Sequence, residues 1–185
     1  MDWAGGLGYV DTHTPQHIFA VRLLLAALFG GMIGFEREAT NGSAGLRTHI
    51  LIAVAACLFT LLAFEIYATA LAGGSNNPDP VRAVEATTAG IAFLGAGAIF
   101  QQRGNVHGLT TGAGMWLAGA VGVATALGYY LIGFGVALLA VLVLAALKAF
   151  AHRIVGDDDD QDGGAQPRGP DHRQPGRDAG KGTVT

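Results

Sequence analysis

Charged side chains are scarce in the first 147 residues, and this scarcity excludes most soluble folds. These residues carry 5 basic and 7 acidic side chains, whereas residues 148–185 carry 6 basic and 7 acidic ones. Charged residues make up 14% of the chain, and a soluble domain carries about 25%. We therefore expect residues 1–147 to lie in a membrane, and the polar remainder to bury no core of its own.

Cysteine and net charge are also low. Cys57 is the only cysteine, which excludes an intrachain disulfide framework and a multi-cysteine metal site. The net charge of -3 excludes the basic surface of a nucleic-acid-binding protein. None of the six histidines lies at metal-ligand spacing from cysteine or carboxylate partners, and no nucleophile–base pair or phosphate loop is visible. We expect no bound metal or cofactor, no nucleic-acid partner and no enzymatic activity.

Apolar residues and glycine are abundant instead. Hydrophobic residues make up 51% of the chain, and there are 29 glycines. Five mostly apolar stretches stand out, over residues 17–35, 48–69, 83–100, 109–127 and 129–150. A helix needs roughly 20 apolar residues to cross a bilayer core of about 30 Å, where its backbone must satisfy its own hydrogen bonds. The sequence therefore predicts an all-α membrane protein, a bundle of about five transmembrane helices.

Lysine and arginine near the span ends predict the orientation. With the N-terminus outside, the outer segments hold only Arg82, and the cytoplasmic segments hold Arg37, Arg47, Arg103, Lys148 and Arg153. We expect an N-out/C-in topology with three parts. These are a short extracytoplasmic segment over 1–16, a transmembrane helical domain over 17–155 and a disordered polar cytoplasmic tail over 156–185. The lipid bilayer is the first partner that this topology implies.

Three ionisable residues, Arg22, Glu65 and Glu85, fall within expected spans at similar depth toward the outer side. Because intramembrane charge costs at least a few kcal/mol, such groups usually face the bundle interior and find partners. They are candidates for an outer charge cluster that serves a cation or a proton. The alternative is that they reach the headgroups and that any pairing among them is structural.

A second candidate cluster is expected at the inner face. Its members lie at the ends or starts of the first four spans and are Glu36, Arg37, Arg47, Thr48, Arg103, Thr110 and Thr111. Glu38, His49 and His107 lie in the same segments but are not members of the candidate set. The functional interpretation is a surface that docks a partner or gates a ligand. The alternative is ordinary interfacial anchoring together with topology signals.

Glycines recur at helix-packing spacing. Two GxxxG pairs are present and further glycines line the third span; the set is Gly30, Gly34, Gly90, Gly95, Gly97, Gly108 and Gly112. Glycine allows the close backbone approach by which helices associate in lipid. These residues either pack helices within one bundle or form the contact of a homodimer.

The ordered segments resemble a known family. Residues 22–38 (RLLLAALFGGMIGFERE) and 44–62 (AGLRTHILIAVAACLFTLL) are similar to the first half of the MgtC/SapB family of bacterial membrane proteins. Residues 89–100 (AGIAFLGAGAIF) and 108–122 (GLTTGAGMWLAGAVG) are similar to its second half, so the resemblance covers about residues 20–147. It implies a bundle of about five helices in the bacterial inner membrane. The motif positions that it carries over are Gly34, Glu36, Arg37, Gly45, Leu46, Arg47, Thr48, Gly90, Phe93, Leu94, Gly95, Gly97, Gly108, Leu109, Thr110, Thr111 and Trp116.

The resemblance also implies a setting for function. The family is associated with magnesium limitation, stress adaptation and, in pathogens, virulence through survival inside host cells. Longer members carry a C-terminal cytoplasmic domain, where this chain has only 38 polar residues after Leu147. The resemblance favours a non-enzymatic modulator of another inner-membrane protein. The alternatives are a transporter of magnesium or another cation, with Arg22, Glu65 and Glu85 outside and Glu36 inside, and a structural homo-oligomer packed through glycine faces.

Overall fold

Five α-helices account for most of the described chain in the computed structural model. The structure describes residues 12–40, 42–74, 79–102 and 105–155. The chain divides into one unit over Met1–Ala149 and a second over Phe150–Thr185. Within the second, only the end of the last helix is described. The helix–helix contacts and the two pockets described below lie within Met1–Ala149.

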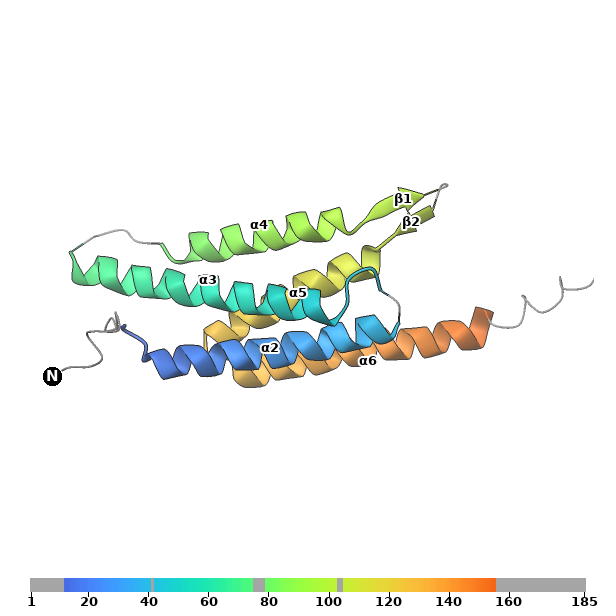
Figure 1. The fold of residues 1–185 in the computed structure, drawn as a ribbon, viewed down its shortest axis with the longest axis horizontal. Helices are drawn as coiled ribbons and strands as arrows, with labels where there is room; N and C mark the ends of the chain where they lie inside the picture. The colour runs from blue at the N-terminus through green and yellow to red at the C-terminus, as the bar shows by residue number, and fades with distance from the viewer. Residues whose placement is uncertain (1–11, 41, 75–78, 103–104, 156–185) are drawn as a thin grey trace, which may run out of the picture. The chain divides into compact units, whose positions relative to one another are not determined.

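The helices agree closely with the predicted spans. Their bounds are α2 (Gln16–Ala39), α3 (Leu46–Ala72), α4 (Val81–Gly97), α5 (Leu109–Ala126) and α6 (Tyr130–Val155). Successive helices run in opposite directions (Figure 1). Pro15 and Pro80 immediately precede α2 and α4, where the fixed φ of proline suits a helix start. The predicted all-α architecture of five helices is confirmed.

Helix length and surface character fit a membrane protein. By length and composition, α2, α3 and α5 can each cross a membrane, whereas α4 and the apolar part of α6, Tyr130–Ala146, are shorter. The 17 residues of α4 are at the lower end of the range for a span. Large apolar side chains are exposed on different helices, among them Phe93 (79%) and Leu131 (84%). Such surfaces are stable against lipid rather than water.

Two predictions concern features that the described residues do not test. The N-out/C-in orientation stays a prediction, because the structure contains no membrane. The predicted tail over 156–185 and most of the predicted N-terminal segment over 1–16 lie outside the described residues.

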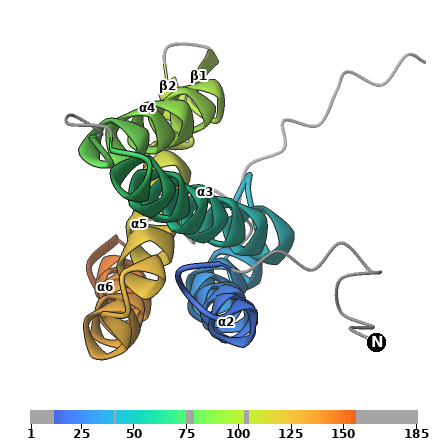
Figure 2. The same ribbon diagram turned by 90° about the vertical axis from the view of Figure 1, so that its left-hand side faces the viewer.

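Helix α3 lies between α2, α4 and α5, as the end-on view shows (Figure 2). Small residues bring the backbones together. A Cβ built on Gly30 of α2 would lie 2.6 Å from the Cβ of Ala53 on α3, and one built on Gly122 of α5 would overlap the Ala53 carbonyl oxygen. Close backbone approach of this kind gives dispersion contacts, which drive helix association in lipid.

The buried core joins all five helices. Ile33 of α2, Ile52 of α3, Ile91 of α4 and Met115 of α5 belong to one cluster of buried apolar side chains, which also includes Ala137 and Ala140 of α6. Phe29 of α2 meets Phe134 of α6 with ring centroids 5.9 Å apart and tilted by 56°, a favourable aromatic geometry. The core therefore fixes the relative positions of the helix ends that carry the polar residues.

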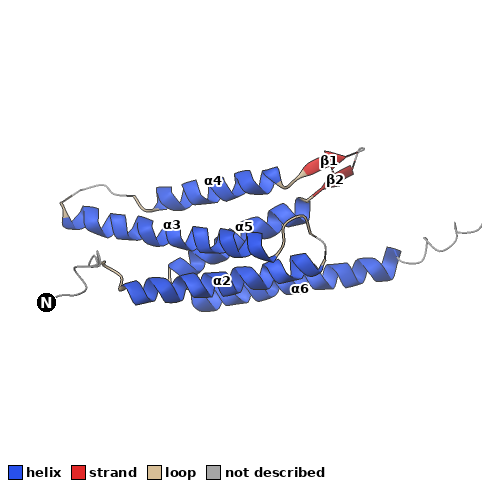
Figure 3. Ribbon diagram, viewed as in Figure 1, coloured by secondary structure: helices blue, strands red, loops and turns tan. Residues whose placement is uncertain are grey.

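A short β-hairpin connects α4 to α5 (Figure 3). Strands β1 (Phe100–Gln102) and β2 (Asn105–His107) pair antiparallel, with Phe100 opposite His107. The third predicted span extends to residue 100, but α4 ends at Gly97, because glycines near its end weaken the helix. We call the end of the bundle that carries this hairpin and the α2–α3 loop the hairpin end (Figure 1).

Candidate functional site

A polar pocket lies at the hairpin end, between the last turn of α2 and the first turn of α5. Its volume is about 270 Å³. Its lining comes from α2, the α2–α3 loop, the hairpin and α5, and consists of Arg37, Gly42, Ser43, Phe100, His107, Gly108, Thr110 and Thr111. We call it the hairpin-end pocket. The fold thus brings together three predicted members of the inner cluster, Arg37, Thr110 and Thr111.

The guanidinium of Arg37 is held in place from two sides. Its Nη2 donates a hydrogen bond of 3.1 Å to Thr111 Oγ1 on α5. On the other side lies Gly42, where a built Cβ would lie 2.9 Å from Arg37 Nη2. The backbone of Gly42 is fixed there by a hydrogen bond of 2.9 Å from its N–H to the Arg37 carbonyl oxygen. Arg37 Nε is buried and has no hydrogen-bond partner among the described residues. The pocket is therefore lined by an oriented cation whose buried Nε is unpaired among the described residues.

His49 lies beneath this arginine, in the first turn of α3, and is fully buried. Its Nδ1 is 2.8 Å from the Gly45 carbonyl oxygen. A carbonyl only accepts, so Nδ1 carries the proton. Its Nε2 has no partner in the described part of the chain, and a Cβ built on Gly114 would lie 3.0 Å from it and 3.9 Å from Arg37 Cδ.

Buried polar atoms without partners gather at this end. Glu36 Oε2, Arg37 Nε and His49 Nε2 are the three such side-chain atoms found in the described residues. All three belong to the end of α2 or the start of α3. Because nearly all buried polar groups in proteins are hydrogen-bonded, a concentration of unpaired ones marks a candidate functional site.

The other predicted inner residues that the structure describes, Glu36, Arg47 and Thr48, do not line the pocket. Arg47 is exposed and Thr48 is half-buried on α3, and Arg103 lies outside the described residues. The neighbouring Glu38 accepts a hydrogen bond of 2.8 Å from Leu46 N, so its carboxylate caps the start of α3. The inner cluster therefore divides into a pocket-lining part and a peripheral part.

The predicted inner cluster includes Arg47 and Thr48 but not His49, although the sequence contains a pattern that indicates a buried role for His49. His49, Ala53, Cys57 and Thr60 recur at helical spacing and form one buried face of α3. This stripe of small and polar residues predicts that His49 points inward and that Arg47 and Thr48 point elsewhere.

At the opposite end, Arg22 is used structurally. Its Nη1 donates a hydrogen bond of 2.7 Å to the Ala126 carbonyl oxygen, and its Nε donates one of 3.2 Å to Tyr130 Oη. Ala126 is the last residue of α5, and Tyr130 is the first residue of α6. The arginine therefore ties α2 to the turn between α5 and α6.

Removing this tie has a measurable consequence. Replacing Arg22 with methionine keeps the apolar stem and removes the guanidinium, so the free energy of unfolding in detergent should fall by about 1–2 kcal/mol, since hydrogen bonds from charged groups are lost. Tyr130→Phe removes only the weaker bond and should cost less. Unfolding monitored by circular dichroism would measure both. An unchanged midpoint in Arg22→Met would contradict the structural role.

Glu65 and Glu85 do not pair with Arg22. The Glu65 carboxylate accepts hydrogen bonds from the backbone N–H groups of His13 and Thr14, the latter at 3.3 Å. Glu85 is exposed near the start of α4. Within the described residues, no ion pair joins the three predicted outer residues, and no group of three His, Cys, Asp or Glu side chains is placed to hold a metal ion.

The seven candidate packing glycines have different environments. A Cβ on Gly30 or Gly34 would collide with α3, at 2.6 Å from Ala53 Cβ and 2.8 Å from Leu46 Cα respectively. Gly95 and Gly112 lie against each other's backbones. Gly108 has a φ of 85° and forms the turn into α5. These glycines serve contacts within one chain, whereas Cβ atoms on Gly90 and Gly97 would meet nothing within 4 Å.

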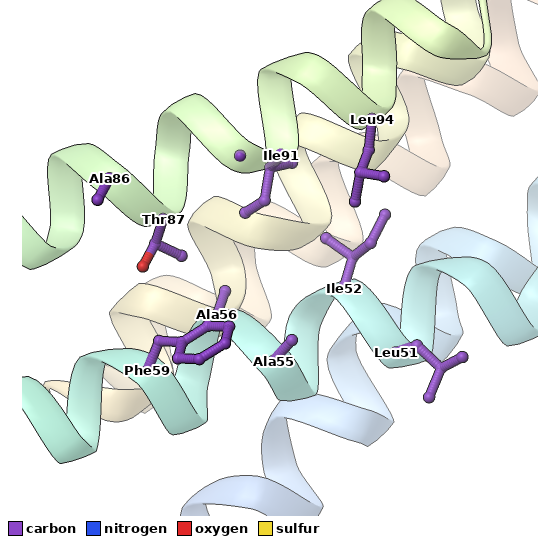
Figure 4. A pocket seen from close by; sticks show the side chains of 10 residues that line it. Leu51, Ile52, Ala55, Ala56, Phe59, Ala86, Thr87, Ile91 and Leu94 are labelled. Atoms are coloured by element: carbon purple, nitrogen blue, oxygen red, sulfur yellow. The ribbon is translucent and has the colours of Figure 1, made fainter.

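Gly90 lies on an apolar groove between α3 and α4, with a volume of about 540 Å³ (Figure 4). The α3 wall consists of Leu51, Ile52, Ala55, Ala56 and Phe59, and the α4 wall consists of Ala86, Thr87, Gly90, Ile91 and Leu94. Figure 4 shows Phe59 and Thr87 at one end of the groove and Leu51 and Leu94 at the other. The groove is therefore a second site that the sequence did not predict.

Comparison with known proteins places the chain among bacterial membrane proteins. Residues 23–153 match the model of the MgtC family. The chain is 35% identical over 137 residues to "Putative magnesium transporter YhiD" of Escherichia coli K12, which covers 74% of the chain and 64% of that protein. It is 44% identical over 98 residues to Protein MgtC of Brucella abortus (53% and 38% covered) and 34% identical over 139 residues to Protein SapB of Bacillus subtilis (75% and 60% covered).

The chain thus spans less than two thirds of the length of these curated relatives. No solved structure matches it. The family match begins within α2 and ends within α6, and it contains the hairpin-end pocket and the α3–α4 groove. From this match and the helical architecture we conclude that the chain belongs to the MgtC family of membrane proteins.

Proposed function

We propose that this protein is a non-enzymatic modulator of another protein of the bacterial inner membrane, active under magnesium limitation or related stress. The observation that supports a modulator best is the open apolar groove between α3 and α4 (Figure 4). The link to magnesium rests on family membership and on the name of the Escherichia coli relative.

The composition of the groove favours a helix as its occupant. Both walls alternate small residues, such as Ala55 and Gly90, with larger apolar side chains, such as Phe59, and small residues let another helix backbone approach closely. The Thr87 hydroxyl donates to the Ala83 carbonyl oxygen at 2.8 Å, so its polar atom is already satisfied. Large side chains separated by small ones match the ridges and grooves of another helix. We therefore assign the groove to a transmembrane helix of the modulated protein.

The protein's own helices use the same type of contact. Gly119 of α5 faces Ile91 of α4 so closely that a Cβ there would overlap the isoleucine side chain. Gly30 and Ala53 meet in the same way between α2 and α3. Gly90 of α4 would allow the same close approach of a helix, but a Cβ added there would meet no heavy atom within 4 Å. The groove thus has the features of a helix contact whose second member is not among the described residues.

Filling the groove should abolish function without unfolding the protein. Gly90→Leu places a large side chain where an added Cβ meets no heavy atom within 4 Å. We expect this variant to accumulate normally and to lose at least tenfold in complementation of a deletion strain grown under magnesium limitation. Gly135→Leu, at a glycine of α6 that is equally open, is the matched control and should complement fully.

Two outcomes would overturn this proposal. Full complementation by Gly90→Leu would show that the groove is not needed. Magnesium flux above empty liposomes, measured with the purified protein alone, would favour transport instead, the activity suggested by the name of the Escherichia coli relative.

A further inference from the structure

We propose that the hairpin-end pocket binds a phosphate group, supplied either by free inorganic phosphate or by a phospholipid headgroup. This inference is independent of the groove between α3 and α4. It rests on the donors that line the pocket, on their lack of acceptors and on the size of the pocket.

The lining of the pocket is rich in hydrogen-bond donors. It contains the Arg37 guanidinium, the His107 ring and the hydroxyls of Ser43, Thr110 and Thr111. No aspartate or glutamate belongs to the described lining. A guanidinium beside several hydroxyls and no carboxylate is the arrangement that oxyanions prefer. The positive charge of the Arg37 guanidinium would repel a metal cation.

The N-terminus of α5 adds backbone donors. Gly112 N donates to the Gly108 carbonyl oxygen at 2.9 Å and closes the first helical turn. The N–H groups of the preceding residues, Leu109 to Thr111, therefore lack acceptors within the helix. No side chain caps this end of the 18-residue helix. Free N–H groups and the positive end of the helix dipole attract anions.

Thr111 provides an independent, buried indication of a ligand. It is only 2% exposed and lines the pocket. The buried hydroxyls of Thr60 and Thr125 donate to the carbonyl oxygens four residues before them, at 2.8 and 2.7 Å. The Thr111 hydroxyl accepts from Arg37 and, in the described part of the chain, makes no such bond to a carbonyl oxygen, so its own proton is available to a ligand. A bound phosphate oxygen would satisfy it.

Arg37 supplies a second unused donor. Its Nη2 is engaged with Thr111, but its Nε is buried without a partner among the described residues. Gly42 packs closely against the guanidinium and limits its movement on that side. Because the side chain is already ordered, binding an oxyanion costs little further entropy.

The size and place of the pocket fit a small anion or a headgroup. Its volume of about 270 Å³ is below the roughly 300–1,000 Å³ of pockets that enclose drug-sized ligands. Its lining residues belong to the hairpin end of the bundle, where helices leave the apolar layer and headgroups are found. Both sources of phosphate can therefore reach it.

The test measures phosphate binding to the purified full chain. The first arm uses radiolabelled inorganic phosphate and delipidated protein in a phosphate-free detergent. The second arm counts phospholipid retained by native mass spectrometry after purification from membranes. We expect saturable binding in at least one arm. Binding in the first arm alone identifies free phosphate as the source, and retention in the second arm alone identifies the headgroup.

The variants separate this pocket from general surface charge. Arg37→Gln should weaken binding at least tenfold, and Thr111→Val should weaken it severalfold. Gly42→Ala keeps every charge but would place a Cβ 2.9 Å from Arg37 Nη2, so it displaces the guanidinium and should also weaken binding. Arg47→Gln removes an exposed arginine that does not line the pocket and should bind normally.

Three results would overturn the proposal. These are no binding in either arm by the wild-type protein, equal losses in Arg37→Gln and Arg47→Gln, and full binding by both Arg37→Gln and Gly42→Ala. Thermal unfolding of each variant shows whether the fold survives. Since Gly42→Ala and Thr111→Val leave the charge unchanged, they keep the test decisive if Arg37→Gln fails to fold.

Discussion

Replacing Gly122 with alanine is expected to disrupt the contact between α3 and α5 and to lower the free energy of unfolding by about 2–3 kcal/mol. The added Cβ would overlap the Ala53 carbonyl oxygen and would lie 3.0 Å from Ala56 Cβ. Overpacking of a filled core typically costs about 1–3 kcal/mol, and this site is at the upper end because one of the atoms met belongs to the backbone, which cannot rotate away. Denaturant unfolding in detergent micelles would measure the change.

Gly135→Ala is the control for Gly122→Ala. Gly135 lies in α6, and a Cβ there would meet nothing within 4 Å. Alanine stabilises a helix by roughly 0.5–1 kcal/mol relative to glycine, so this variant should be neutral or slightly more stable. Equal stability of the two variants would contradict the packing of α5 against α3.

Gly108→Ala should be the second severe substitution. Gly108 precedes α5 with a φ of 85°, a conformation that costs a residue with a side chain about 1–2 kcal/mol. Its Cβ would in addition overlap the Ala98 carbonyl oxygen and lie 3.3 Å from Ile99 Cα. We expect a total loss of about 3–4 kcal/mol, because both contacts are with backbone, and a displaced hairpin. Unfolding in detergent would report the loss.

A matched glycine isolates the steric part of this effect. Gly74 has a φ of 80°, but a Cβ there would meet nothing within 4 Å. Gly74→Ala therefore carries the backbone penalty alone and should lose only about 1–2 kcal/mol. If the two variants lose the same amount, the close approach of Gly108 to the segment after α4 is wrong.

The helices were predictable because lipid imposes a simple rule. Apolar runs interrupted by polar connectors gave all five helices, and Pro15 and Pro80 mark two of their starts. The hairpin was not predicted, since residues 101–107 contain no strong strand pattern. The turn from β2 into α5 is made by Gly108, whose positive φ is visible only in the folded chain.

The candidate sites were predictable only in part. Arg37, Thr110 and Thr111 lie in one pocket as members of the predicted inner cluster. Arg22, Glu65 and Glu85 did not come together, because similar depth does not specify which helix face each residue occupies. The α3–α4 groove could not be predicted either. It depends on how α4 packs against α3, and the small residues of both helices fit a closed contact as well as an open groove.

The most direct test of the proposed function is site-specific photo-crosslinking in cells from Ala86, which lines the groove (Figure 4). A crosslinker at Leu139 of α6, 59% exposed, reports ordinary lipid-facing surface. We predict one identified inner-membrane protein joined at position 86, lost with Gly90→Leu, retained with Gly135→Leu, and absent at position 139. An adduct with a second copy of this chain, or the same products from both positions, would contradict the account.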